Sequence, residues 1–128
     1  MLGDEYKPDS ERDNKIDPDF LTEEFQMIPL ILNHYGKIKA EAQYEFEMAK
    51  SQADFLENQK YVELKLDKEL KFTEQQAKSA AKVEPAVQEA IKAMHDRKRE
   101  LGVIISYTES LKAKKDMLIQ LGADARKE

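Results

Sequence analysis

The chain has 128 residues, of which 37% are charged, and it contains only four glycines and four prolines. This length allows a single domain, and the composition favours long helices with solvated faces over a β-sheet protein. Because the chain contains no cysteine, disulfides, thiolate catalysis and cysteine-based zinc sites are excluded.

The acidic charge is concentrated at the start of the chain. Residues 1–28 carry nine acidic and three basic side chains, whereas residues 29–128 are almost neutral. Since residues 1–19 also contain few apolar groups, we expect them to form an acidic flexible arm. They lack the apolar core of a signal peptide, and no apolar run approaches the roughly 20 residues that span a bilayer. We therefore expect a cytoplasmic protein without membrane contact.

The apolar spacing of the first half predicts a short helix followed by a long one. The short helix begins at Phe20, and Pro29 is expected to end it and to begin the next. Residues 30–71 then predict a long helix, because apolar side chains recur in steps of three and four. They are Ile31, Tyr35, Ile38, Ala42, Phe46, Ala49, Ala53 and Leu56, with Val62, Leu66 and Leu70 beyond them.

The second half predicts a short connector and another long helix. Thr73 and Gln76 match the pattern of a capping box at the start of a helix over 74–82. A long helix over 85–122 follows, with Pro85 in its first turn and Gly122 just past its end. We therefore predict an all-α fold in which the two long helices form an antiparallel hairpin with short accessory helices. The hairpin domain would cover residues 20–122, followed by a tail at 123–128.

The apolar stripe of the last helix is wider than one partner helix needs. Heptad spacing and a second apolar edge point to self-association into a homo-oligomeric ring or bundle, although the 20–28 helix could cover the same edge. The candidate assembly residues are Val87, Ile91, Met94, Leu101, Ile104, Ile105, Leu111 and Leu118.

No catalytic or metal-binding constellation is recognisable in the sequence. His34 and His95 are isolated, the serines lie inside predicted helices without a nucleophile motif, and there is no glycine-rich phosphate loop. We expect a protein that is not an enzyme and needs no cofactor or metal.

Clustered cations suggest phosphate binding, which clusters of lysine and arginine favour through counterion release. The same residues could equally be ordinary solvated helix faces. The candidate nucleic-acid-binding residues are Lys60, Lys65, Lys68, Lys71, Lys92, Arg97, Lys98, Arg99, Lys112, Lys114 and Lys115.

The order of these features over residues 16–122 resembles the UvsY-type recombination mediators of T-even and related phages. The resemblance rests on five segments: Ile16-Asp17, Asn33-His-Tyr-Gly-Lys37, Lys71-Phe-Thr-Glu74, Val83-Glu-Pro-Ala-Val87 and Ser110-Leu-Lys-Ala-Lys-Lys-Asp-Met-Leu118.

This resemblance implies an all-helical homo-oligomer in the host cytoplasm. It would bind single-stranded DNA and help to load a RecA-like recombinase onto strands covered by single-strand-binding protein. Two alternatives remain open at this point. One is a helical assembly or adaptor protein of a phage without DNA binding, and the other is an acidic inhibitor of a nucleic-acid-binding partner.

Overall fold

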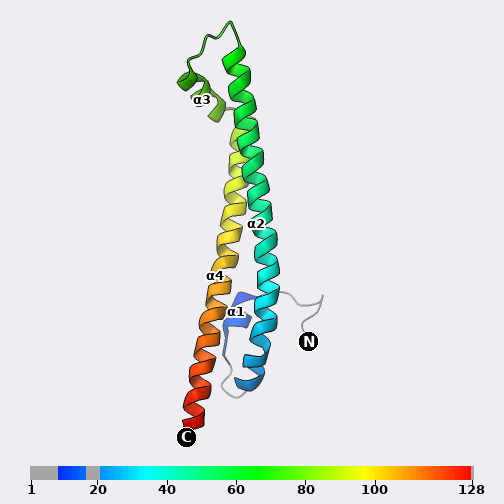
Figure 1. Ribbon diagram of the computed structural model, residues 1–128, viewed down its shortest axis with the longest axis vertical. Coiled ribbons are helices and arrows are strands. Elements are labelled where there is room, and N and C mark those ends of the chain that lie inside the picture. The colour runs from blue at the N-terminus through cyan, green and yellow to red at the C-terminus, as the bar shows by residue number, and fades with distance from the viewer. Residues whose placement is uncertain (1–8, 17–20, 128) are drawn as a thin grey trace. The chain divides into compact units, whose positions relative to one another are not determined.

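The computed structural model describes residues 9–16 and 21–127. They form four helices, α1 (Ser10–Asn14), α2 (Leu21–Leu66), α3 (Glu74–Lys82) and α4 (Pro85–Lys127) (Figure 1). The described residues contain no strand, so the prediction of an all-α chain with two long packed helices is confirmed. Nowhere in the described ranges is a helix apolar enough over its length to cross a membrane.

The chain divides into two compact units. Unit 1 consists of Met1–Glu41 and Gly102–Glu128, and unit 2 consists of Ala42–Leu101. Helices α2 and α4 each contribute a segment to both units. Within each unit these segments run in opposite directions (Figure 1), as expected of a helical hairpin.

Large apolar side chains from α2 and α4 form the core of unit 1. Ile28, Ile31 and Tyr35 of α2 pack with Leu111 and Leu118 of α4. The ring of Tyr35 also meets that of Tyr107 edge to face, with centroids 6.3 Å apart, which is a favourable aromatic geometry.

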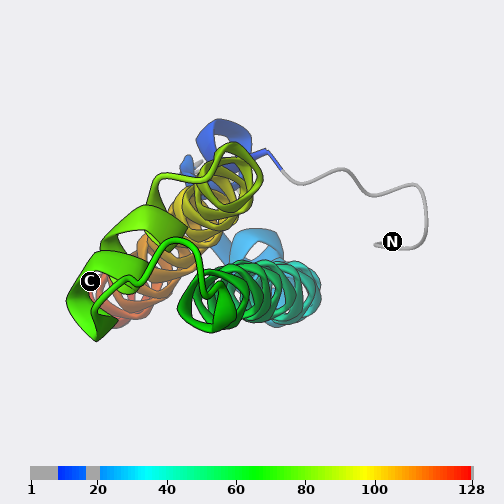
Figure 2. The same cartoon turned by 90° about the horizontal axis from the view of Figure 1, so that it is seen from above.

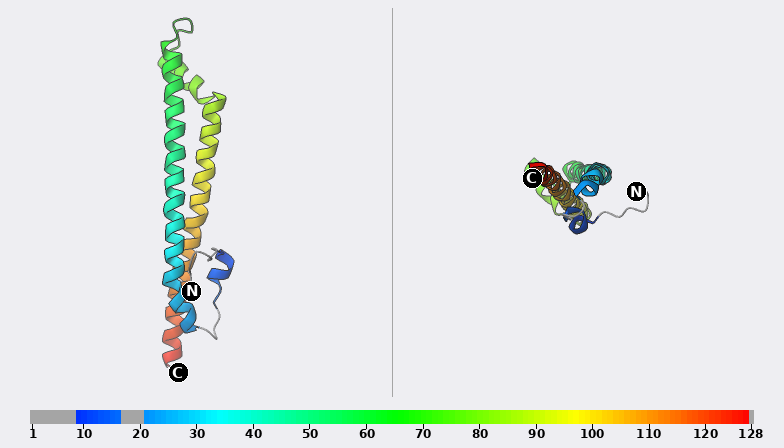
Figure 3. Two further views of the ribbon diagram at one scale, coloured as in Figure 1. Left: turned by 90° about the vertical axis from the view of Figure 1, so that its right-hand side faces the viewer. Right: turned by 90° about the horizontal axis from the view of Figure 1, so that it is seen from below.

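Part of the predicted flexible arm is packed on this core. Residues 10–14 form α1, whose N-cap Asp9 accepts a hydrogen bond from the backbone N–H of Arg12. Asp13 is buried, with 4% of its surface exposed, and accepts a hydrogen bond from the hydroxyl of Tyr35 at 3.0 Å. Figures 1 and 3 show α1 beside the long helices of unit 1. The prediction of a loose arm is thus wrong for residues 9–16, while 1–8 and 17–19 lie outside the described residues.

The core of unit 2 is built mainly from alanine. Its buried apolar residues are Ala42, Ala53, Ala77, Ala81, Val87 and Leu101. Two of these alanines belong to α3, which lies to one side of the α2 and α4 segments when the unit is seen from above (Figure 2). Small side chains let helix backbones approach closely, but they remove less apolar surface from water than larger ones do.

The predicted start of α3 is confirmed, because Thr73 and Gln76 form a complete capping box. The Thr73 hydroxyl accepts a hydrogen bond from the backbone N–H of Gln76 at 3.2 Å, and the Gln76 side chain accepts one from the backbone N–H of Thr73 at 3.0 Å.

Pro29 does not end a helix, contrary to the sequence prediction. Helix α2 runs through it without a break in assignment. Pro29 has no N–H to donate to the carbonyl of Phe25, so α2 lacks one backbone hydrogen bond at this turn. Ile28 and Ile31 are buried on either side of Pro29, and their packing offsets the lost hydrogen bond.

Both long helices end at residues other than those predicted. Helix α2 ends at Leu66 and not at residue 71, because the Asp67 side chain accepts the N–H of Glu69 at 2.9 Å and so favours a turn. Lys71 in this turn has a φ of 52°. Helix α4 continues past Gly122 to Lys127, so residues 123–127 are not a separate tail. A hydrogen bond from Gln120 to Asp124 supports this last part of the helix.

Candidate interaction surface

Half of the predicted assembly residues on α4 are buried by packing within the chain. Val87, Leu101, Leu111 and Leu118 are buried, and in unit 1 the last two contact the α2 core residues. These four residues are therefore not available to another molecule, and their prediction as an interface is wrong. The other four predicted residues, Ile91, Met94, Ile104 and Ile105, are half-buried.

Lys114 is a core residue and not a nucleic-acid contact. Its ammonium group lies 2.6 Å from a carboxylate oxygen of Glu24 and donates to the backbone carbonyl of Asp13 at 2.6 Å. Only 4% of the Lys114 side chain is exposed. The prediction for Lys114 is wrong because its charge is already neutralised inside unit 1.

Three more predicted cations form ion pairs with acids of unit 2. Lys60 pairs with Glu63 and Glu84, and Arg99 pairs with Asp96. Arg97 pairs with Glu100 at 3.0 Å and with Glu45 at 3.7 Å. The hydrogen bond to Glu100, together with the charges of Glu100 and Glu45, raises the pKa of Arg97 above its ordinary value. These neighbouring carboxylates weaken the positive potential that a phosphate would meet.

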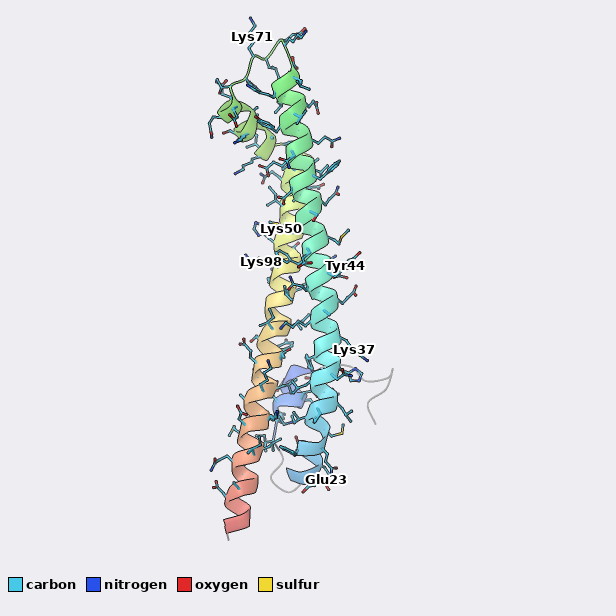
Figure 4. All side chains as sticks on the ribbon, viewed as in Figure 1. Glu23, Lys37, Tyr44, Lys50, Lys71 and Lys98 are labelled. Atoms are coloured by element: carbon cyan, nitrogen blue, oxygen red, sulfur yellow. The ribbon has the colours of Figure 1, made fainter. Side chains whose placement is uncertain are left out.

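The remaining seven predicted cations are exposed but dispersed. Lys65, Lys68 and Lys71 surround the turn after α2, and the Lys65 ammonium donates to the carbonyl of Phe72 at 3.2 Å. The other exposed cations are Lys92 and Lys98 in unit 2, and Lys112 and Lys115 in unit 1. Figure 4 shows Lys71 and Lys98 far apart along unit 2. The structure thus gathers only the three lysines of the turn.

The most prominent surface feature of unit 2 is an exposed apolar row on α2. We call it the α2 stripe, and it consists of Tyr44, Met48, Phe55, Val62 and Leu66. Each of these side chains is at least half exposed, from 50% for Val62 to 73% for Leu66. At 3.6 residues per turn, all five lie within about 40° of one another around the helix.

The α2 stripe lies almost opposite the buried side of α2. Ala42 and Ala53, which are buried, are about 150° away from Phe55 around the helix. Figure 4 shows Tyr44 on the side of α2 that is turned away from α4. In this unit the fully buried residues of α2 are alanines, Phe46 and Leu56 are half-buried, and the five large side chains of the stripe are exposed.

Sequence reasoning missed the α2 stripe although its spacing was visible. The sequence pattern indicates a shift of the buried face at Val62 and Leu66, yet both side chains are exposed. The available signal is a second apolar row, with steps of four, seven, seven and four residues, on nearly the opposite side of the helix from the alanine-rich row. Two such rows on one helix indicate two separate contacts.

The described ranges contain one larger hollow and no cluster of metal ligands. A hollow of about 430 Å³ lies between α2 and α3, and polar side chains such as Glu57, Tyr61 and Lys78 line much of it. Among residues 9–16 and 21–127, no group of three or more His, Cys, Asp or Glu side chains is placed to hold a metal ion.

Comparison with protein-family models, with curated proteins and with solved structures finds no match to this chain.

Proposed function

We propose that this chain is a non-catalytic helical assembly protein that binds another protein through the α2 stripe. The observation that carries this proposal is the exposure of five large apolar side chains in one row on a helix that already has a buried side. This is the adaptor function that the sequence left open beside DNA binding.

The size of the α2 stripe supports the proposal. Five large side chains, each at least half exposed, present on the order of 500 Å² of apolar surface in a row that polar residues such as Gln52 and Gln59 interrupt. Exposed apolar surface of this size often marks a binding site. Moving such a surface out of water is the main source of favourable free energy in protein association. The row also runs along one helix, which suits a helical partner that lies alongside it.

Photo-crosslinking in the native host cell tests the proposal. Benzoylphenylalanine in place of Phe55 should form a covalent adduct of defined mass with one protein. The matched control places the same group at Met117, which is 58% exposed on α4 in unit 1. An adduct yield at residue 55 no higher than at residue 117 would contradict the proposal.

A second candidate function is the recombination mediator that the resemblance implies, and one observation favours it. Lys65, Lys68 and Lys71 are exposed together at the turn after α2, with Tyr61 nearby in sequence as a group for base stacking. Such a mediator would contact single-stranded DNA here and would also bind a RecA-like recombinase and single-strand-binding protein.

Binding of labelled oligo-dT at several salt concentrations tests this second function. If three lysines neutralise three phosphates, the slope of log affinity against log salt should be about −2. Replacing Lys65, Lys68 and Lys71 by Gln should remove most of this dependence, while replacing Lys112 and Lys115 should not. The absence of binding by the intact chain at low salt excludes the mediator function.

A further inference from the structure

We infer that the α2 stripe is occupied by a second copy of this chain, lying antiparallel with Phe55 at the two-fold axis. The inference rests on the proposed function, because it names the protein that covers the stripe.

The first support is the symmetry of the spacing. Counting outward from Phe55, Met48 and Val62 are each seven residues away, and Tyr44 and Leu66 are each eleven away. The spacing of the large side chains is therefore the same in both directions from Phe55. A two-fold antiparallel pair places Met48 opposite Val62 of the other copy and Tyr44 opposite Leu66, so every large side chain meets another one. A closed two-fold interface requires this kind of self-complementary surface.

The second support is the charge beside the stripe. Glu47 and Lys65 are both exposed, and they are eighteen residues apart, which is five turns of helix. They therefore lie on the same side of the stripe. When the two-fold axis is perpendicular to both helices, residues on one side of the stripe lie opposite residues on the same side of the stripe in the second copy. Glu47 then lies opposite Lys65 of the second copy, offset by about 3 Å along the helix, and the symmetry forms this ion pair twice. Asp54 lies on the same side close to the axis and faces Asp54 of the second copy, so one contact between like charges stands against the two ion pairs.

The centre of the other side of the stripe is uncharged. Gln52 and Gln59 occupy it, and with Phe55 on the axis each lies nearly opposite the other in the second copy. Farther out, Glu45 lies opposite Glu63 of the second copy, and Arg97 and Lys60 of their own chain counter these two charges. Amide side chains can donate and accept hydrogen bonds across such a contact. In a parallel pair Glu47 faces the glutamine side instead, so the Glu47–Lys65 ion pair is not formed.

The third support is the area. With on the order of 500 Å² of apolar surface from each copy, the pair would bury about 1,000 Å² before the flanking residues are counted, which reaches the lower limit for a specific interface. An association that dissociates on dilution is expected at this size.

Analytical ultracentrifugation of the purified full chain tests the inference. The wild-type chain should sediment as a dimer at about 100 µM and dissociate on dilution. Phe55→Asp should weaken association at least about 100-fold, because it places two carboxylates at the buried centre. Met117→Asp, at a comparably exposed position in unit 1, should leave the dimer unchanged. Circular dichroism of each variant confirms that the helices are retained.

Charge reversal tests the antiparallel register. Glu47→Lys alone and Lys65→Glu alone should each weaken the dimer about ten-fold, and the double variant should restore it to near the wild-type affinity, because the pairs re-form with exchanged signs. A dimer that Phe55→Asp leaves intact, or a double variant no tighter than the single variants, overturns the inference. A wild-type chain that stays monomeric also overturns it, whereas an adduct of residue 55 with a different protein would still support the proposed function.

Discussion

The ammonium group of Lys114 lies 2.6 Å from the carboxylate of Glu24 in the interior of unit 1. The same ammonium donates to the carbonyl of Asp13, so one side chain of α4 binds both α2 and the segment that carries α1. In the sequence Lys114 belongs to a basic cluster, but in the structure its polar contacts connect α4 with α2 and with α1.

Loss of the Lys114 charge should destabilise unit 1. In Lys114→Ala, Glu24 and the Asp13 carbonyl lose their partner, and breaking a buried ion pair costs about 3 kcal/mol. The free energy of unfolding in urea measures this change. Lys115→Ala is the matched control, because Lys115 is exposed and its loss should cost less than about 0.5 kcal/mol. Equal effects of the two substitutions would contradict the assignment of Lys114 to the core.

Removal of the Tyr35 hydroxyl should loosen α1. In Tyr35→Phe the ring remains in the core, but the buried Asp13 carboxylate loses a hydrogen bond donor, at a cost of about 1–2 kcal/mol. Hydrogen exchange should become faster in residues 10–14 and remain unchanged in unit 2. Tyr44→Phe, at an exposed tyrosine, should leave exchange in α1 unaltered. Unchanged exchange in Tyr35→Phe as well would mean that this hydrogen bond does not hold α1.

Loss of the Thr73 cap should destabilise α3. The hydroxyl of Thr73 satisfies the N–H of Gln76, and replacing such a capping residue by alanine costs about 1 kcal/mol. The expected result in Thr73→Ala is faster hydrogen exchange in residues 74–82. Ser51→Ala serves as the control, since Ser51 is exposed in the interior of α2. Exchange that is equally slow in both variants would exclude a stabilising cap.

Enlargement of a core alanine should be costly in unit 2. Ala53 is 3% exposed, and added methylenes in a packed core cost about 1–3 kcal/mol. We expect Ala53→Leu to lower the denaturation midpoint, whereas Ala113→Leu, at an exposed position on α4, should not. A more stable Ala53→Leu protein would show that α2 is loosely packed at this point.

Most of the fold could be predicted from local sequence signals. The all-α class and the capping box at Thr73 follow from composition and short-range spacing, and both are confirmed. The errors at Pro29, Leu66 and Gly122 arise because tertiary packing or a local turn overrides these signals. The docking of α1 depends on Tyr35 and Lys114, which are distant in sequence, so no local pattern could reveal it.

The candidate surface was harder to predict. The row of α2 predicted to be buried is the inner one in unit 2, where Ala42 and Ala53 are buried and Phe46 and Leu56 half-buried. The helical pattern does not show that a second apolar row remains exposed. Charge clusters were similarly ambiguous, because Arg97 and Lys60 each pair with a glutamate three residues ahead and also with one from a distant part of the chain, which only the fold brings near.

The rate of oxidation of two methionines tests the central claim most directly. Met48 belongs to the α2 stripe and Met117 lies in unit 1, and the two are similarly exposed in a single chain, at 54% and 58%. Hydroxyl-radical labelling of the wild-type protein at high concentration should oxidise Met48 about five-fold more slowly than Met117, because oxidation follows exposure, and the two rates should converge on dilution. Equal rates at every concentration would contradict the claim that the α2 stripe is a binding surface covered by a second copy of the chain.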